Sequence, residues 1–308
     1  MFTLDGTSRQ HVSFRKLVPN LLTTVSLCSG LASIHYSLRA AGLQLEYELV
    51  AAGKPLLAGQ LAEIEAMWKT AMLAIGVAAV FDLLDGRAAR LLRASSRFGA
   101  VYDSLSDFLS FGVAPAILIQ QWMLRSHGAL GMAAVLAFVL CAALRLARFT
   151  AMPKQPLSMS ALSKFFSGLP TPAAAGAVLV PPMLDVAKYF PFTNGKGKLA
   201  PEVQGAFDSL EPALVMVNTF LIAALMVSRI PMFSFKKIRV KRSLVVPLMV
   251  AFGMVVLAMF RDPWLTIPVV VWCYLFTLPF ATVAHKRIWA ELGQHKPQAT
   301  PAQESDHE

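Results

Sequence analysis

The sequence contains few charged residues for its length. Asp, Glu, Lys and Arg make up 15% of the 308 residues, whereas 56% are hydrophobic and the mean hydropathy is +0.57. Soluble globular domains carry about 25% charged residues. The shortage of charge therefore excludes the one or two soluble domains that this length would otherwise suggest. Together with the long apolar runs, it predicts an all-α polytopic membrane protein.

Cysteine is scarce as well. The three cysteines, Cys28, Cys141 and Cys273, all lie inside apolar segments and match no metal-ligand spacing. We interpret them as small apolar residues of the helix interiors. We also expect no cleavable signal peptide, because residues 1–16 are polar and the apolar run after them is too long and lacks a cleavage site.

Long apolar runs fill most of the chain. A helix needs roughly 20 apolar residues to cross the bilayer core. Eight segments meet that need, near residues 18–39, 67–92, 98–122, 128–151, 169–187, 212–231, 244–261 and 264–285. We predict a bundle of six transmembrane helices over 18–238 and a two-helix transmembrane extension over 239–287. Residues 1–17 form a cytoplasmic N-terminal segment in this prediction, 188–210 an external loop, and 288–308 a polar, disordered tail.

The basic residues gather on one side of this predicted bundle. Most of the 28 lysines and arginines fall in segments that share a side if the spans alternate, namely 1–17, 87–97, 145–164, 229–242 and 286–296. Lys and Arg concentrate on the cytoplasmic side of membrane proteins. We therefore expect both termini in the cytoplasm. The net charge of +10 then reflects topology and attraction to anionic membrane lipids, rather than binding to nucleic acid.

Four aspartates stand at the edges of two adjacent apolar segments. The stretch that contains them, residues 81–107, reads FDLLDGRAARLLRASSRFGAVYDSLSD. Asp82 and Asp85 are three residues apart and share one helix face, and Asp103 and Asp107, four apart, share another. The linker is short enough to make the two helices antiparallel neighbours, so that both faces can line one cleft at the cytoplasmic surface. Charges at the edge of a membrane interior indicate a functional site.

Carboxylates gathered in one cleft repel one another and take up protons unless cations offset them. Oxygen ligands suit Mg²⁺, Mn²⁺ or Ca²⁺, and the lack of nearby His and Cys argues against zinc. Two such ions would suit phosphoryl transfer, because they can hold both the attacking and the leaving oxygen. Gly86 and Ala89 leave room for a ligand, and Arg90 is placed to meet a phosphate. The alternative to a metal site is that the aspartates are helix-end charges solvated at the membrane interface. That alternative could explain a single aspartate, but it explains less well two facing helix faces that each carry two aspartates.

This stretch resembles the motif D-x2-D-G-x2-A-R-x8-G-x3-D-x3-D of the CDP-alcohol phosphatidyltransferase family. Every fixed position is matched, by Asp82, Asp85, Gly86, Ala89, Arg90, Gly99, Asp103 and Asp107. The resemblance implies a transmembrane helix bundle that binds a CDP-linked lipid or alcohol and moves its phosphoryl group to a hydroxyl, releasing CMP.

The same resemblance implies roles for individual residues. Two divalent ions, either Mg²⁺ or Mn²⁺, would be held by Asp82, Asp85, Asp103 and Asp107. Asp107 would also act as the general base. CDP would be bound by Asp82, Gly86, Ala89, Arg90 and Gly99. Homodimers are common in the family, and the apolar helices here are compatible with one.

Further stretches resemble the membrane-embedded phosphatidylserine synthases of bacteria and archaea. They are LVPNLLTT at 17–24, SLSDFLSFGVAPA at 104–116, ALRLARFT at 143–150, FSGLPTPAAA at 166–175 and LMVSRIPMFSFK at 225–236. This resemblance implies CDP-diacylglycerol and L-serine as substrates. Glycerol phosphate, inositol phosphate and choline are the alternative acceptors. A cation transporter is a weaker alternative, because its carboxylates would stand near the midplane rather than beside arginines.

Four polar residues outside the aspartate stretch are candidates for the acceptor or a phosphate. Arg145 and Arg148 could present guanidinium groups to the serine carboxylate, could bind a lipid phosphate, or could extend their charged ends to the membrane surface. Asn20 could bond the nucleotide or serine, or could belong to the start of its helix. Lys164 could meet a phosphate or be a solvated loop residue.

Overall fold

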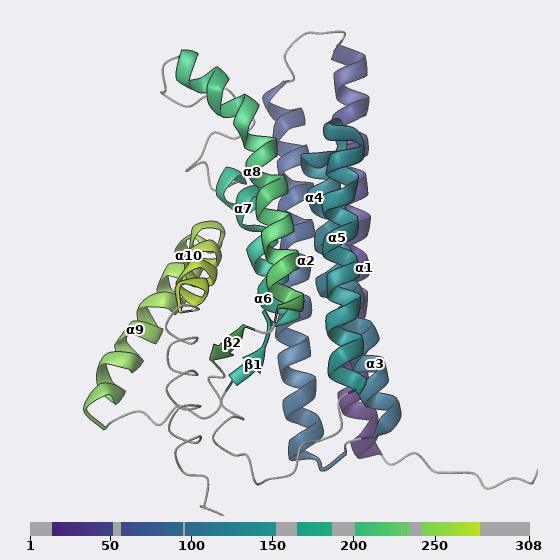
Figure 1. The fold of residues 1–308 in the computed structure, drawn as a ribbon, viewed down its shortest axis with the longest axis vertical. Coiled ribbons are helices and arrows are strands. Elements are labelled where there is room, and N and C mark those ends of the chain that lie inside the picture. The colour runs from purple at the N-terminus through teal and green to yellow at the C-terminus, as the bar shows by residue number, and fades with distance from the viewer. Residues whose placement is uncertain are drawn as a thin grey trace, which may run out of the picture.

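The computed structural model describes residues 14–51, 57–94, 96–151, 165–186, 201–228, 230–233 and 242–277. Within them the chain is mainly helical (Figure 1). The first half contains α1 (Phe14–Ala51), α2 (Ala58–Leu91), α3 (Arg97–Asp107), the π-helical turn η1 (Phe108–Val113), α4 (Ala114–Trp122), the 3₁₀ turn η2 (Leu124–His127) and α5 (Gly128–Ala151). The second half contains α6 (Thr171–Val178), α7 (Val180–Val186), α8 (Pro201–Val227), α9 (Arg242–Arg261) and α10 (Pro263–Phe276).

Four helical stretches are long and apolar enough to cross a membrane. They are Leu17–Ala51, Ala58–Leu91, Leu124–Ala151 and Leu210–Val227, and two shorter apolar helices cover Val245–Arg261 and Pro263–Phe276. The expected segment 98–122 is helical but is divided by the π-helical turn, and the expected segment 169–187 forms two short helices, α6 and α7. A membrane helix bundle is thus confirmed, whereas eight full spans and the orientation of the termini stay predictions.

Two expectations about the second half of the chain need correction. The predicted loop 188–210 is partly helical, because α8 already begins at Pro201. Proline is well tolerated in the first turn of a helix, where its missing N–H costs no hydrogen bond. The chain is also not wholly α, since β1 (Phe165–Ser167) pairs antiparallel with β2 (Pro231–Phe233). Isolated three-residue strands leave little trace in hydrophobic periodicity.

Gly168 explains why the strand pair forms where it does. Its φ of +79° lies in the left-handed region, and a Cβ at this position would stand 2.6 Å from the Met226 carbonyl oxygen. Glycine avoids both penalties. The turn is held by Gly168 N–H donating to the Ile230 carbonyl at 3.1 Å and by Leu169 N–H donating to the Leu225 carbonyl at 3.1 Å. The segment before α6 is thereby fixed against the end of α8.

Helix α1 packs against α2 and also against α3, η1 and α4. Serine hydroxyls bond the backbone across these interfaces: Ser26 donates to the Ala78 carbonyl at 3.0 Å and Ser110 donates to the Ser26 carbonyl at 3.1 Å. Gly30 faces Ser110 so closely that any Cβ there would collide with it. Small residues of this kind let membrane helices approach each other. Because α1 contacts both α2 and α3, it sets the relative position of the two aspartate-bearing helices.

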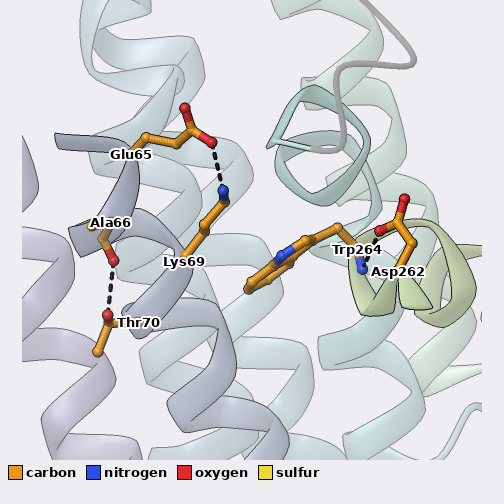
Figure 2. Close-up of polar contacts among 6 residues, drawn as sticks. All are labelled: Glu65, Ala66, Lys69, Thr70, Asp262 and Trp264. Carbon is orange, nitrogen blue, oxygen red and sulfur yellow. Dashed lines mark hydrogen bonds and ion pairs between the residues drawn. The ribbon is translucent and has the colours of Figure 1, made fainter. Parts of the chain in front are cut away.

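The end of the bundle with α3, the C-terminal part of α2 and the strand pair is called the site end below (Figure 1). Helices α9 and α10 stand to one side of the bundle, and α10 packs against α6 and α7. Asp262 caps α10 by accepting from Trp264 N–H at 3.1 Å and Leu265 N–H at 3.2 Å. Figure 2 shows this cap and the Trp264 ring extending toward α2, where Glu65 and Lys69 form an ion pair of 2.6 Å.

Candidate active site

Three of the four aspartates converge at the site end. Asp82 and Asp85 belong to the last turns of α2, and Asp103 belongs to α3. One carboxylate oxygen from each lies within 4.8 Å of the other two. The face of α2 that carries Asp82 and Asp85 therefore lies next to the face of α3 that carries Asp103, as the spacing predicted.

A pocket of about 480 Å³ opens beside these carboxylates. Its lining consists of Asp82, Leu83, Asp85, Gly86, Arg87, Arg90 and Asp103. Its volume lies in the usual range of small-molecule sites. Gly86 faces open space, with no heavy atom within 4 Å of where a Cβ would stand. The pocket thus combines three carboxylates with two guanidinium groups, a donor set suited to a metal-bound phosphate ester.

Arg87 is a lining residue that sequence reasoning missed. It occupies one of the variable positions of the motif, next to Gly86, and the sequence offered no reason to prefer it over Arg93 or Arg97. Its place in the pocket follows from the position of α3 across from α2, which helical spacing alone does not give.

Ala89 and Gly99, expected at the CDP site, are not among the residues that line this pocket. Ala89 is half-buried on α2. Gly99 lies in the first turn of α3, where its N–H donates to the capping Ser96 Oγ at 2.9 Å. A Cβ on Gly99 would stand 3.2 Å from Asn20 Oδ1. The structure therefore brings Asn20 to the start of α3, where glycine permits the close approach of α1.

Helix α1 supports the aspartates through two adjacent threonines. Thr23, which is 4% exposed, donates its hydroxyl hydrogen to Asp85 Oδ2 at 2.5 Å, and its Oγ1 also lies 3.1 Å from the Pro19 carbonyl oxygen. Thr24 Oγ1 lies 3.0 Å from the hydroxyl of Tyr102 on α3. Sequence reasoning singled out the stretch 17–24 but not these hydroxyls, because their partners lie more than 60 residues away in the chain.

Asp107 stands next to the trio, at the point where α3 passes into η1. It lies within hydrogen-bonding reach of Asp82, and its Oδ1 is buried with no hydrogen-bond partner in the described part of the chain. A buried carboxylate oxygen without a partner carries a desolvation cost.

Arg145 approaches Asp107 from α5. It lies within electrostatic range of that carboxylate, and its Nη1 donates to Thr171 Oγ1 on α6 at 2.6 Å. Arg148 is half-buried one turn further along α5. Lys164 lies outside the described residues. Within the described part of the chain, the fold thus brings the acceptor candidate Arg145 close to Asp107.

The trio fits a divalent cation by its donor chemistry. Asp85 is 4% exposed, and within the described ranges no lysine or arginine forms a direct ion pair with Asp82, Asp85 or Asp103. Buried carboxylates without a countercharge are costly, and hard cations such as Mg²⁺ and Mn²⁺ prefer carboxylate oxygens.

Comparisons with known proteins place the chain among related sequences. Residues 16–194 match the model of the CDP-alcohol phosphatidyltransferase family. The chain is 31% identical over 283 residues to a CDP-diacylglycerol–serine O-phosphatidyltransferase of Mycobacterium leprae, covering 92% of this chain and 79% of that protein. It is 29% identical over 266 residues to the protein of the same name in Helicobacter pylori, covering 84% and 92%. A Methanocaldococcus jannaschii protein of that name shares 44% identity over 96 residues, or 31% of this chain and 42% of the relative.

Proposed function

This chain belongs to the CDP-alcohol phosphatidyltransferase family, and we propose that it transfers the phosphatidyl group of CDP-diacylglycerol to the hydroxyl of L-serine, giving phosphatidylserine and CMP. Its relatives of the phosphatidylserine synthase type support serine as the acceptor. The observation that carries the proposal is the convergence of Asp82, Asp85 and Asp103 on a pocket that also contains Arg87 and Arg90.

The first part of the proposed mechanism is binding of the nucleotide. Arg87 and Arg90 would pair with phosphate oxygens of CDP, and Gly86 would admit the nucleotide close to the α2 backbone. A divalent metal held by Asp82, Asp85 and Asp103 would neutralise the pyrophosphate and the charge on the departing CMP. The acyl chains would remain among the exposed apolar side chains of the bundle.

The second part is attack by serine. Arg145, beside Asp107, would pair with the serine carboxylate. Asp107 would take the proton from the serine hydroxyl while that oxygen forms a bond to the lipid-side phosphorus and the bond from phosphorus to CMP breaks. General-base help of this kind contributes roughly a hundred- to ten-thousand-fold in rate.

The proposed location follows from the charge distribution. The site end carries the arginine-rich turn between α2 and α3, and Lys and Arg accumulate on the cytoplasmic side. We therefore propose that the site faces the cytoplasm, at the inner membrane of a bacterium, where water-soluble serine and membrane-held CDP-diacylglycerol can both reach it.

An acceptor panel tests the proposed function. Purified protein would be incubated with CDP-diacylglycerol, Mg²⁺ or Mn²⁺, and serine, glycerol 3-phosphate, inositol phosphate or choline, and CMP release would be measured. We expect serine-dependent release that EDTA abolishes. Release only with another acceptor would overturn the serine assignment and leave the family assignment intact.

A further inference from the structure

Arg145 lies about one turn beyond the contact between α5 and the π-helical turn η1. A Cβ on Gly112 of η1 would stand 3.1 Å from the Ala142 Cβ of α5. Arg145 is three residues after Ala142 and shares its helix face. Asp107 is five residues before Gly112, the separation at which residues of a π-helix are hydrogen-bonded to each other. Arg145 and Asp107 are therefore both on the site-end side of the contact between the two elements.

Thr171 holds the Arg145 guanidinium from a further helix, α6. Its Oγ1 accepts a hydrogen bond of 2.6 Å from Arg145 Nη1, and the residue is 1% exposed. Thr171 is the first residue of α6, whose start has no side-chain cap, so its hydroxyl serves α5 rather than its own helix. The backbone hydrogen bonds of Gly168 and Leu169 to the segment 225–230 hold this helix start in place. Arg145 is thus bound by a hydroxyl whose own position is fixed.

The contact with Thr171 leaves most donors of Arg145 for a ligand. A guanidinium has five N–H donors in a planar fork. Nη1 bonds Thr171, whereas Nε is buried and has no hydrogen-bond partner in the described part of the chain. A buried donor without a partner is costly. A guanidinium that is bound at Nη1 can still offer Nε and Nη2 together, and such a pair of donors matches the two oxygens of a carboxylate.

We propose that Thr171 is a positioning residue for the acceptor: its hydroxyl holds Nη1 of Arg145, so that Nε and Nη2 receive the acceptor carboxylate. The inference deepens the proposed function and rests on it, because serine is the acceptor in the panel that carries a carboxylate. Thr171 touches no reacting atom in this scheme and acts through Arg145. Without the hydroxyl, the guanidinium loses its fixed partner, and it can turn away from the orientation that binds the acceptor.

Thr171→Val tests this inference, because valine keeps the branched shape of threonine and lacks the hydroxyl. Hydrogen bonds to charged groups are stronger than those between neutral groups, so we expect the KM for serine to rise roughly ten-fold or more. The KM for CDP-diacylglycerol should stay near the wild-type value, since Thr171 does not line the pocket beside the aspartates. Thr171→Ser keeps the hydroxyl and should restore most of the affinity for serine. Thr171→Ala lacks the hydroxyl, adds no apolar group beside the guanidinium, and should repeat the rise.

Thr219→Val is the matched control. Thr219 is also 1% exposed, but its hydroxyl donates to the Val215 carbonyl of its own helix at 2.8 Å. This variant should leave the KM values for serine and CDP-diacylglycerol unchanged. A rise in the serine KM as large as that of Thr171→Val would show a general effect of removing a buried hydroxyl, and it would overturn the inference.

Arg145→Lys provides the second arm. Lysine cannot offer the same planar pair of donors, so if Thr171 acts through Arg145, adding Thr171→Val to Arg145→Lys should raise the serine KM no further. Independent, multiplicative effects would overturn the inference, as would an unchanged serine KM in Thr171→Val and Thr171→Ala or an equal rise in both KM values. In those cases the wild-type protein still uses serine and the proposed function survives. A wild-type protein that does not use serine overturns both.

Discussion

Asp107 differs from the other three aspartates in its surroundings. Asp82, Asp85 and Asp103 present oxygens to one another, whereas Asp107 has a buried oxygen without a hydrogen-bond partner among the described residues and lies near Arg145. This difference supports the proposal that the trio would hold a cation and that Asp107 would take the proton. Four residues that share one motif can therefore divide the chemistry between binding and proton transfer.

Asp107→Asn should lower turnover by roughly a hundred- to ten-thousand-fold, because an amide cannot accept the acceptor's proton. Binding of CDP-diacylglycerol should persist, since Asp107 is not part of the lining of the pocket. The two properties are measured by CMP release and by equilibrium binding to the purified protein. Ser104→Ala, on the same helix and bonded only to its own turn, is the control. Near-normal turnover of Asp107→Asn would exclude this residue as the base.

Thr23 acts on the trio from a different helix. Its hydroxyl donates to Asp85 Oδ2, which fixes the orientation of that carboxylate. Hydrogen bonds that orient metal ligands commonly affect metal affinity by ten- to a hundred-fold. Thr23 is therefore expected to matter for metal binding even though it offers the metal no carboxylate of its own.

Thr23→Val should weaken Mn²⁺ binding by roughly ten-fold or more, because it keeps the side-chain shape and removes the donor. Thr23→Ser should restore most of the affinity. Electron paramagnetic resonance titration of Mn²⁺ against purified protein measures this without relying on turnover. Thr24→Val removes the neighbouring hydroxyl, which contacts Tyr102 instead of a carboxylate. Equal losses in Thr23→Val and Thr24→Val would argue for a general packing effect.

At the scale of elements, the site depends on how α1 meets η1. The π-helical turn follows Asp107 directly, and such turns are frequent at functional sites. Ser110 of this turn bonds the α1 backbone opposite Gly30. The close contact fixes the position of α3 along the axis of α1. Helix α1 in turn packs along α2.

Gly30→Val should destabilise the bundle by about 1–3 kcal/mol, because its side chain would collide with Ser110 in a packed interface. The thermal midpoint of the detergent-solubilised protein measures the effect, and CMP release should fall in parallel as α3 shifts. Gly76→Val is the matched control, since no heavy atom lies within 4 Å of a Cβ at that position. A midpoint no lower in Gly30→Val than in Gly76→Val would contradict the close-contact explanation.

At the scale of the whole molecule, polar features separate to opposite ends. The site end holds the aspartates and Arg87, Arg90, Arg93 and Arg97. The other end holds the contacts between Tyr47 and Glu63 and between Glu65 and Lys69. Apolar side chains such as Phe252 and Phe260 are exposed on α9, as expected for surfaces that face lipid.

Cysteine labelling of intact bacterial cells tests the orientation. In a variant with the three native cysteines replaced by alanine, Gly59→Cys should react with a membrane-impermeant maleimide added outside. Arg97→Cys should react only after the membrane is permeabilised, because both residues are exposed but lie at opposite ends of the bundle. The reverse pattern would place the site outside the cytoplasm.

Much of the element-level organisation could be predicted from composition and pattern. The apolar runs identified the long helices. The spacing of Asp82, Asp85 and Asp103 predicted that the aspartate-bearing faces of two helices would lie next to each other. The strand pair at Gly168, the early start of α8 at Pro201 and the division of 98–122 by a π-helical turn could not be predicted. These features depend on backbone contacts between distant segments, which hydrophobic periodicity does not record.

The sequence by itself determined that this protein is a membrane helix bundle with a carboxylate site on one helix pair. Both conclusions depend on local properties, namely the cost of burying charge in lipid and the geometry of a single helix. Only the tertiary structure decided which other residues join that site. Thr23, Arg87 and Arg145 come from different helices or from a variable motif position, and they meet near the aspartates because α1 and α5 pack in the bundle in particular registers. Packing registers of this kind arise from side-chain fit between helices far apart in the chain, so a motif within one helix pair does not contain them.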